Sequence, residues 1–330
     1  MPGLFGLISI KSGVRLDPEF IHNTIDRMEH KLRHVAQYEC ERYVDPDSSF
    51  AIARIGFPYM NTVEWDNRFT HPNAQLVSFY SGILHESSHN DRRSEFTAVS
   101  GPNISEFLCK LKGFFSVAGG DLSSSRIFIA VDRHASRPIY YCVIRDVLYF
   151  APEVKALLEV LNFDKAIDFG AVAAFLKTGC LYGNQTLFNS VRRLKGGEYL
   201  LIEQDKLRVN SYWKFKPGSK VDCTDEFALQ EELGSRINNA VEVNLSGVSP
   251  TVILLSGGID SRAVLGAALE SRQGHENDLN VVTWCTESCG TNSDIGIARK
   301  IVEKHGLHHH VYYREAAKYR EGLDELLNYY

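Results

Sequence analysis

The sequence predicts a two-part protein in which a mixed α and β region is followed by a parallel, doubly wound α/β region. Short apolar or alternating runs separated by polar turns fill the first two thirds of the 330 residues. Strand and helix patterns alternate in the last third, as in a parallel sheet. The polar segment 214–224, which contains Pro and Gly, is predicted to link the two regions.

The elements of the first region follow from its hydrophobic periodicity. Apolar residues at helical spacing predict helices, and alternating or continuous short apolar runs predict strands. Helices are expected at 18–35, 104–111, 152–161 and 169–178. Strands are expected at 4–10, 50–57, 76–84, 114–118, 126–131, 139–144 and 147–150, with a hairpin formed by 198–203 and 207–212.

The second region begins with a predicted helix at 225–245. Strands at 251–255, 279–283 and 311–313 then alternate with helices at 260–271 and 293–305. A last amphipathic helix is predicted at 314–329, and its apolar stripe would need a partner surface, either a continuation of the chain or a second copy. The simplest interpretation is a fragment of a longer protein.

Composition and charge exclude several classes of protein. The chain has 36 Lys and Arg against 41 Asp and Glu, a formal charge of −5, and 44% apolar residues. This is a globular composition without a basic stripe, which argues against a nucleic-acid partner. No stretch approaches the ~20 apolar residues of a membrane span, and the N-terminus lacks the features of a signal peptide. We therefore expect a cytoplasmic protein with no membrane partner.

The seven cysteines predict reduced, buried thiols rather than a disulfide framework, because their number is odd and most lie in apolar runs. Cys285, Cys289 and the histidines at 308–310 could be drawn as a metal site, but their spacing fits no zinc pattern well.

The strongest local feature is the sequence LLSGGIDS at 254–261. An apolar strand runs into Gly257 and Gly258, which allow close backbone approach, and a helix starts at once. The loop amides and the helix N-terminus suit a pyrophosphate group, with hydroxyl donors from Ser256 and Ser261. Asp260 would repel a bare phosphate, so we expect it to hold Mg²⁺ on the phosphates. A plain strand-to-helix turn with Asp260 as N-cap is the alternative.

Around this loop the chain resembles the asparagine synthetase family that uses glutamine as nitrogen donor. Six segments are similar to family motifs and occur in the family's order: MPGLFG (1–6), YSGI (80–83), LKGFFS (111–116), DRHASRPIYY (132–141), FAPEVKAL (150–157) and the pair Tyr212-Trp213. The resemblance implies an N-terminal-nucleophile glutaminase-like αββα sandwich at 1–213, a linker at 214–224, and the first part of a PP-loop ATP-binding domain at 225–330. It also implies that Leu254 and Trp284 contact adenosine, although either could be plain core. We expect Asp294 to be a helix N-cap.

Departures from the family concern the glutaminase chemistry. The family's nucleophile is the Cys that follows Met1, and Pro2, which has no thiol, stands there. The family's Arg-Gly-Pro-Asp stretch is missing near His34, Ser81 replaces an Asn, and Arg54 is offset by about two positions from the family's carboxylate-binding Arg. No acidic partner for the glutamine amine is found in 94–101. An inactive scaffold domain is the main interpretation; a retained glutaminase, or Pro2 acting through its secondary amine, are the alternatives.

The resemblance therefore implies an ATP- and Mg²⁺-dependent amide ligase without its own glutaminase. It would adenylate a small-molecule or peptide carboxylate and transfer the acyl group to ammonia or to a substrate amine. The second option resembles β-lactam synthetases and lasso-peptide cyclases, relatives that close rings in this way. A non-catalytic regulatory pseudoenzyme and an ATP sensor are the rival interpretations.

Overall fold

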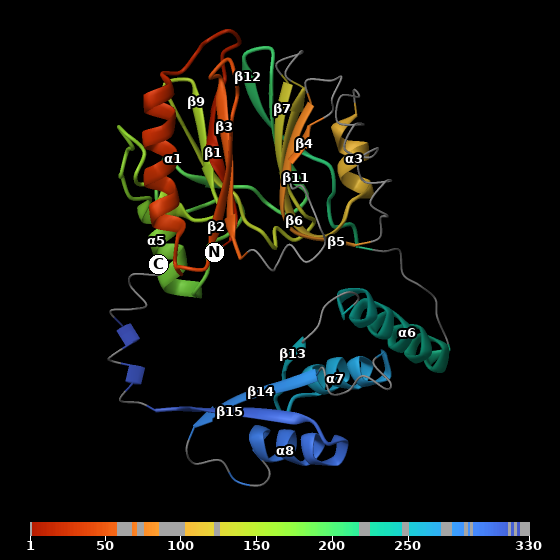
Figure 1. The fold of residues 1–330 in the computed structure, drawn as a ribbon. Helices are drawn as coiled ribbons and strands as arrows, with labels where there is room; N and C mark the ends of the chain where they lie inside the picture. Colours follow the sequence, from red (N-terminus) through yellow and green to blue (C-terminus); the bar gives the residue numbers. More distant parts are fainter. Residues whose placement is uncertain are drawn as a thin grey trace. The chain divides into compact units, whose positions relative to one another are not determined.

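The computed structural model describes residues 2–57, 68–70, 76–85, 103–121, 126–217, 225–245, 251–271, 279–286, 290, 293–315, 318–319 and 322–323. The chain forms two compact units, residues 1–216 and 217–330, and Figure 1 shows the elements of each. Among the described residues, no helix combines the length and the apolar character that a membrane crossing requires.

Unit 1 is built on two six-stranded sheets in which every described strand pair is antiparallel. The first sheet has the order β10 (Arg192–Arg193), β8 (Tyr140–Ile144), β9 (Val147–Ala151), β1 (Gly3–Ser9), β3 (Phe50–Gly56) and β2 (Glu39–Val44). The second has the order β12 (Lys206–Ser211), β11 (Glu198–Glu203), β7 (Arg126–Val131), β6 (Lys112–Asp121), β5 (Leu76–His85) and β4 (Arg68–Thr70).

Three hydrophobic clusters hold the two sheets and the helices on their outer faces together as four layers. One cluster, which includes Leu4, Phe50 and Ile129, fills the space between the sheets. A second packs α1 (Pro18–Leu32) and α4 (Val154–Leu157) on the outer face of the first sheet, and a third packs α3 (Ile104–Lys110) on the outer face of the second. Figure 1 shows α1 and α3 on opposite sides of the sandwich. Unit 1 is therefore an αββα sandwich, as the resemblance implied.

Strand β1 runs through the centre of the first sheet and is buried along its whole length. Gly6 allows this close packing, because a Cβ there would collide with the carbonyl oxygen of Ala51. Pro2 precedes the strand at one end of the sandwich, and Ser9 ends it at the other. Seven residues at ~3.3 Å each separate these ends by roughly 20 Å.

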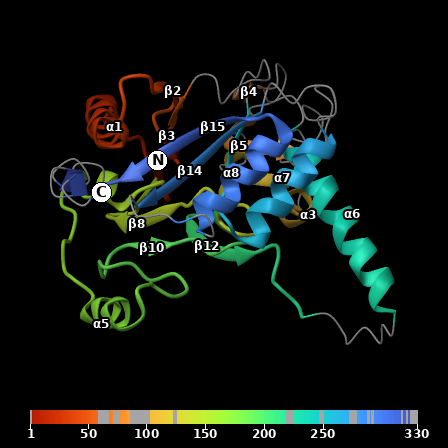
Figure 2. The same ribbon diagram turned by 90° about the horizontal axis from the view of Figure 1, so that it is seen from below.

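Unit 2 contains a three-stranded parallel sheet in the order β13 (Thr251–Leu254), β14 (Leu279–Thr286) and β15 (His308–Arg314). Helices α7 (Ile259–Ser271) and α8 (Asp294–His305) pack on one face of it, and α6 (Glu226–Leu245) lies beside α7 (Figure 2). The prediction of a doubly wound sheet is wrong for the described strands. Their order follows the sequence, and right-handed crossovers then place successive helices on the same face.

Most predicted elements are present, with differences at polar segments. Strands β2, β4 and β10 were not predicted, and the helix expected at 152–161 is reduced to α4. Strand β15 begins at His308 and includes Arg314, which the sequence placed in a last helix; the rest of that helix lies largely outside the described residues. Helix α5 (Phe169–Thr178) has the predicted bounds, set by an Asp168 N-cap and a left-handed Gly179 C-cap.

The expectation of buried thiols holds only in part among the described cysteines. Cys142 is buried and Cys40 and Cys285 are partly buried, whereas Cys109 and Cys180 are exposed. Burial raises the pKa of the Cys142 thiol to about 12, so this side chain stays a thiol at neutral pH.

Candidate functional site

The N-terminal end of unit 1 holds a small hollow at the position where the resemblance places the glutaminase site. Pro2 lines it, and its ring packs against Gly56, where a Cβ would lie 3.1 Å from the Pro2 Cβ. Arg54, Ser81 and Arg137 line the other walls. The hollow measures about 20 Å³, which is close to the space of a single water molecule.

Two arginines from distant parts of the chain face this hollow. Arg54 is mostly buried and forms an ion pair of 3.5 Å with Glu41. Burial lowers the pKa of the Arg137 guanidinium from its ordinary value. The sequence suggested that Arg54 was displaced from the family's carboxylate-binding position, but the structure places its side chain in the same hollow as Pro2.

A hydrogen-bonded group of three side chains lies near the N-terminus. His34 Nε2 is 2.8 Å from Glu153 Oε1, and Lys155 Nζ is 3.3 Å from His34 Nδ1 and 3.2 Å from Glu153 Oε2. Burial, the positive charge of the N-terminus and Lys155 outweigh the carboxylate and lower the pKa of His34 to about 4. The imidazole is therefore neutral at pH 7, donating from Nε2 and accepting at Nδ1. Sequence reasoning missed this group, because its members are separated by about 120 residues.

These residues do not supply a nucleophile of the kind that the family uses. Position 2 has no thiol, and the nearby Cys40 has its pKa raised to about 12 by burial and by the carboxylate of Glu29. The segment 94–101, in which the sequence showed no acidic partner, lies outside the described residues.

The loop 255–258 of unit 2 connects the end of β13 to the start of α7. Hydrogen bonds between Ser256 of the loop and Ser261 of α7 close it: Ser261 Oγ lies 2.9 Å from Ser256 Oγ and accepts from the Ser256 amide at 3.1 Å. The Gly258 amide donates to Ser256 Oγ at 3.2 Å. The predicted residues Ser256, Gly257, Gly258, Asp260 and Ser261 thus lie together in one turn and the first turn of a helix.

Several amides of this turn are free to bind a ligand. Among the described residues, the main-chain N–H groups of Gly257, Ile259, Asp260 and Ser261 donate to no acceptor. The first N–H groups of a helix have no partner within the helix and carry a partial positive charge. The donor set fits an anion such as pyrophosphate.

A second helix starts against the same loop. A Cβ at Gly257 would lie 2.5 Å from Asp294 Oδ1 and 2.8 Å from Asp294 Cα, so only glycine allows α8 to approach. Asp294 is the first residue of α8, and its expected role as N-cap is wrong, since Ser293 is the cap and accepts from the Gly296 amide. Two helix N-termini therefore meet at this loop. Asp260 is not a cap either; it lies exposed in the first turn of α7.

The two residues expected at adenosine lie together on the sheet face that α7 and α8 do not cover. Leu254 pairs with Val282 in register, and Trp284 follows two residues later on the same face. Their exposed fractions are 56% and 48%, so neither is plain core. Arg314 lies over the Trp284 ring at 5.8 Å from its centroid.

A chain of hydrogen bonds, which we call the brace, ties the loop to the sheet. The sequence did not reveal it. The Leu255 amide donates to Val282 O at 2.9 Å, and buried Thr283 donates from Oγ1 to Leu255 O at 2.8 Å. His309 Nε2 lies 2.9 Å from the same hydroxyl, which is then its acceptor. The brace links all three strands just before Ser256. Among the described residues, no three His, Cys, Asp or Glu side chains are grouped as a metal site.

Comparisons with known proteins agree with the two-unit structure. A family model described as a glutamine amidotransferase domain matches residues 99–213, and one described as asparagine synthase matches residues 232–330. Asparagine synthetase [glutamine-hydrolyzing] 1 of Bacillus subtilis is 30% identical over 168 residues, covering 50% of this chain and 26% of that protein. Asparagine synthetase [glutamine-hydrolyzing] 2 of the same organism is 24% identical over 364 residues, covering 99% of this chain and 45% of that protein.

A differently named relative is amidase chyE of Penicillium rubens, which is 28% identical over 285 residues that cover 79% of this chain and 41% of that protein. The chain thus spans less than half the length of each of these three relatives. The resemblance that the motifs indicated is confirmed: the chain belongs to the asparagine synthetase-like family, with a glutamine amidotransferase-like unit followed by part of an asparagine synthase unit.

Proposed function

We propose that this chain contributes the nucleotide-binding part of an ATP-dependent amide ligase that has no working glutaminase of its own. The observation that supports it most is the meeting of two helix N-termini at loop 255–258. The loop has free amides, and the hydroxyls of Ser256 and Ser261 lie beside them, which is an environment that suits a pyrophosphate group.

The proposed reaction has two steps. A carboxylate oxygen attacks the α-phosphorus of ATP, the bond to pyrophosphate breaks, and an acyl-adenylate forms. A nitrogen nucleophile then attacks the acyl carbon and AMP leaves. The loop residues stabilise the charge that develops on pyrophosphate: the amides of Gly257 and Ile259 donate to it, and the hydroxyls of Ser256 and Ser261 can reorient toward it. Leu254 and Trp284 would hold adenosine on their exposed sheet face.

The carboxylates around the loop also fit Mg²⁺. Mg²⁺ is commonly bound through one or two carboxylates together with substrate phosphates. Asp260 would be such a ligand, and Asp294, at the start of α8, lies against the same loop. The metal ion would neutralise charge on the phosphates during the first step.

The proposed absence of glutaminase activity rests on unit 1. Pro2 cannot form a thioester with glutamine, and the hollow beside it has the size of a water molecule. Nitrogen would therefore come from free ammonia or from an amine of the substrate. The carboxylate substrate is proposed only as a class, a small molecule or a peptide.

A thermal-shift titration of the full chain with Mg·ATP tests the nucleotide site. A ligand at about 100 times its Kd stabilises the native state by roughly 2.7 kcal/mol. We expect this shift in wild type and in Glu303→Ala, a control on the exposed face of α8, and its loss in Asp260→Ala.

ATP–pyrophosphate exchange with a panel of carboxylates tests the chemistry. Carboxylate-dependent exchange supports the ligase. A thermal shift without exchange for any carboxylate favours the rival, a regulatory ATP-binding protein. Competition between ammonia and candidate amines identifies the nitrogen source.

A further inference from the structure

A second cavity lies in unit 1, at the end of the sandwich opposite Pro2. It has a volume of about 520 Å³ and is bordered by the end of β1, the loop 10–15, the β2–β3 turn and the β11–β12 turn. This volume is within the range of small-molecule sites, about 300–1,000 Å³. Neither the loop 255–258 nor the glutaminase-like hollow contributes to it.

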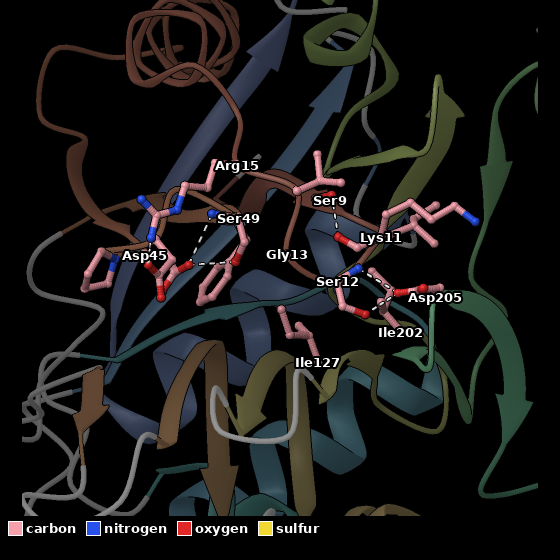
Figure 3. A pocket seen from close by; sticks show the side chains of 15 residues that line it. Ser9, Lys11, Ser12, Gly13, Arg15, Asp45, Ser49, Ile127, Ile202 and Asp205 are labelled. Carbon is pink, nitrogen blue, oxygen red and sulfur yellow. Dashed lines mark hydrogen bonds and ion pairs between the residues drawn. The ribbon is translucent and has the colours of Figure 1, made fainter.

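The floor of the cavity is apolar and part of the main core. Ile10, Phe50, Ile127 and Ile202 line it, and each is at least 93% buried because its exposed fraction is 7% or less. Figure 3 shows Ile127 between two polar walls. Such a floor favours a ligand with an apolar body.

One polar wall carries a buried carboxylate of which, among the described residues, only one oxygen is hydrogen-bonded. Asp45 is 7% exposed, and its Oδ2 accepts from the Ser49 amide at 3.1 Å and from Ser49 Oγ at 2.6 Å. Among the described residues, Oδ1 has no hydrogen-bond donor and Asp45 has no cation within ion-pair distance. Asp45 is one of the residues that line the cavity. A buried negative charge in this state attracts a positively charged group.

A guanidinium lines the same side of the cavity (Figure 3). Figure 3 shows Arg15 and Asp45 on the same side of the cavity. Arg15 Nη2 contacts Asp47 Oδ1 at 2.6 Å, and among the described residues its Nε and Nη1 have no acceptor. The Arg15 and Asp47 side chains are 75% and 73% exposed, so their ion pair contributes little and a ligand can exchange with it.

On the opposite wall, a carboxylate is held by hydrogen bonds within the protein. The Ser12 amide donates to Asp205 Oδ1 at 2.6 Å and the Ser12 hydroxyl donates to the same oxygen, which ties loop 10–15 to the β11–β12 turn. These hydrogen bonds lower the pKa of Asp205. Figure 3 shows this pair across the cavity from Asp45.

We propose that this cavity binds an α-amino acid with an apolar side chain. Its ammonium group would bind Asp45 Oδ1, its carboxylate would bind the free N–H groups of Arg15, and its side chain would lie on the isoleucine floor. A zwitterion carries both of the charges that a carboxylate and a guanidinium lining one cavity would bind. The site is independent of the proposed ligase activity.

Calorimetric titration of the full chain with L-leucine tests the proposal, with three analogues that each lack one group. These are 4-methylpentanoic acid without the ammonium, 3-methylbutylamine without the carboxylate, and glycine without the side chain. We expect saturable binding of L-leucine and at least tenfold weaker binding of every analogue. No saturation by L-leucine, L-phenylalanine or L-methionine up to about 10 mM, which bounds the binding free energy near −3 kcal/mol, would overturn the proposal.

Charge-deleting variants locate the site. Asp45→Asn keeps the acceptor for Ser49 and should weaken leucine binding at least tenfold, as should Arg15→Gln. Asp47→Asn should bind at least as tightly as wild type, because it releases Arg15. Arg208→Gln, an exposed change on β12, is the control. If Asp45→Asn fails to fold, the exposed Arg15→Gln decides. Equal binding of 3-methylbutylamine and leucine, or wild-type affinity in Arg15→Gln, contradicts the proposal.

Discussion

Replacing Thr283 by valine should loosen loop 255–258. The change removes the hydroxyl through which Thr283 bonds to Leu255 and His309 and keeps the rest of the side chain's shape. Valine has the shape of threonine without the hydroxyl, and Thr283 is 3% exposed. The Leu255 carbonyl would lose its donor at 2.8 Å, and His309 Nε2 would lose its acceptor at 2.9 Å. With net contributions of about 1 kcal/mol for each bond, and more where a buried group is left unpaired, the loss is about 2–3 kcal/mol.

Hydrogen–deuterium exchange over residues 251–286 measures this effect within the full chain. A loss of 2 kcal/mol corresponds to roughly thirtyfold faster exchange of amides that open with the brace. Thr283→Ser is the matched variant, since it keeps the hydroxyl and loses one methyl group at a cost of about 0.8 kcal/mol. His309→Gln should retain most of the protection, because its side-chain amide can donate to Thr283.

Equal exchange rates in the valine and serine variants would refute the reasoning. In that case the loss of the Thr283 hydroxyl would cost no more than the loss of one methyl group, and the hydroxyl would not hold the loop. Faster exchange in the valine variant should be accompanied by weaker binding of Mg·ATP, since the brace ends one residue before Ser256.

Three other predictions concern unit 1. Its free energy of unfolding should fall as the pH falls from about 6.5 towards 4, because the pKa of His34 is lowered in the folded state and the unfolded chain therefore binds the proton more readily. His34→Gln, which can make both hydrogen bonds, should flatten this pH profile of unfolding in urea. An unchanged profile contradicts the assignment. Asp132→Ala should lower the free energy of unfolding by at least about 3 kcal/mol, because this buried carboxylate accepts four hydrogen bonds. They come from the amides of Phe115, His134 and Ser136 and from Ser136 Oγ. A loss under about 1 kcal/mol, the scale of an ordinary point mutation, would count against this role. Pro2→Cys should release no ammonia from glutamine, because the family's Arg-Gly-Pro-Asp stretch and the Asn that Ser81 replaces are still missing. Measurable glutaminase activity would refute that.

Local sequence signals predicted the elements whose ends are determined locally. Helix α5 has its predicted bounds because Asp168 caps it and Gly179 takes the left-handed conformation with φ +74° at its end. Strand β2 was missed for the opposite reason. It is an edge strand with the sequence ECERYV and no buried residue, so hydrophobic periodicity gives no signal.

The parts of the site that sequence reasoning missed are contacts between distant residues. Thr283 and His309 are 26 positions apart, and His34 and Glu153 are 119 apart. In the sequence, the histidine run at 308–310 could be drawn only as part of a metal site. The alternation of β15 instead turns His309 toward the sheet face that α7 and α8 cover. Arg54 shows the same limit, since its position in the hollow depends on strand pairing rather than on motif spacing.

Two glycines within the family motifs of unit 1 are required by its backbone. Gly82 and Gly113 have φ values of +125° and +132°, and a Cβ at either would collide with the backbone of the paired strand, at Phe114 and Ile83 respectively. Neither glycine can be replaced cheaply, whether or not the unit is a catalyst. Positions that would serve only the chemistry, such as the Cys that Pro2 replaces, are free of that constraint. Intact glycines at these two positions beside a proline at position 2 agree with the proposal that unit 1 has no working glutaminase.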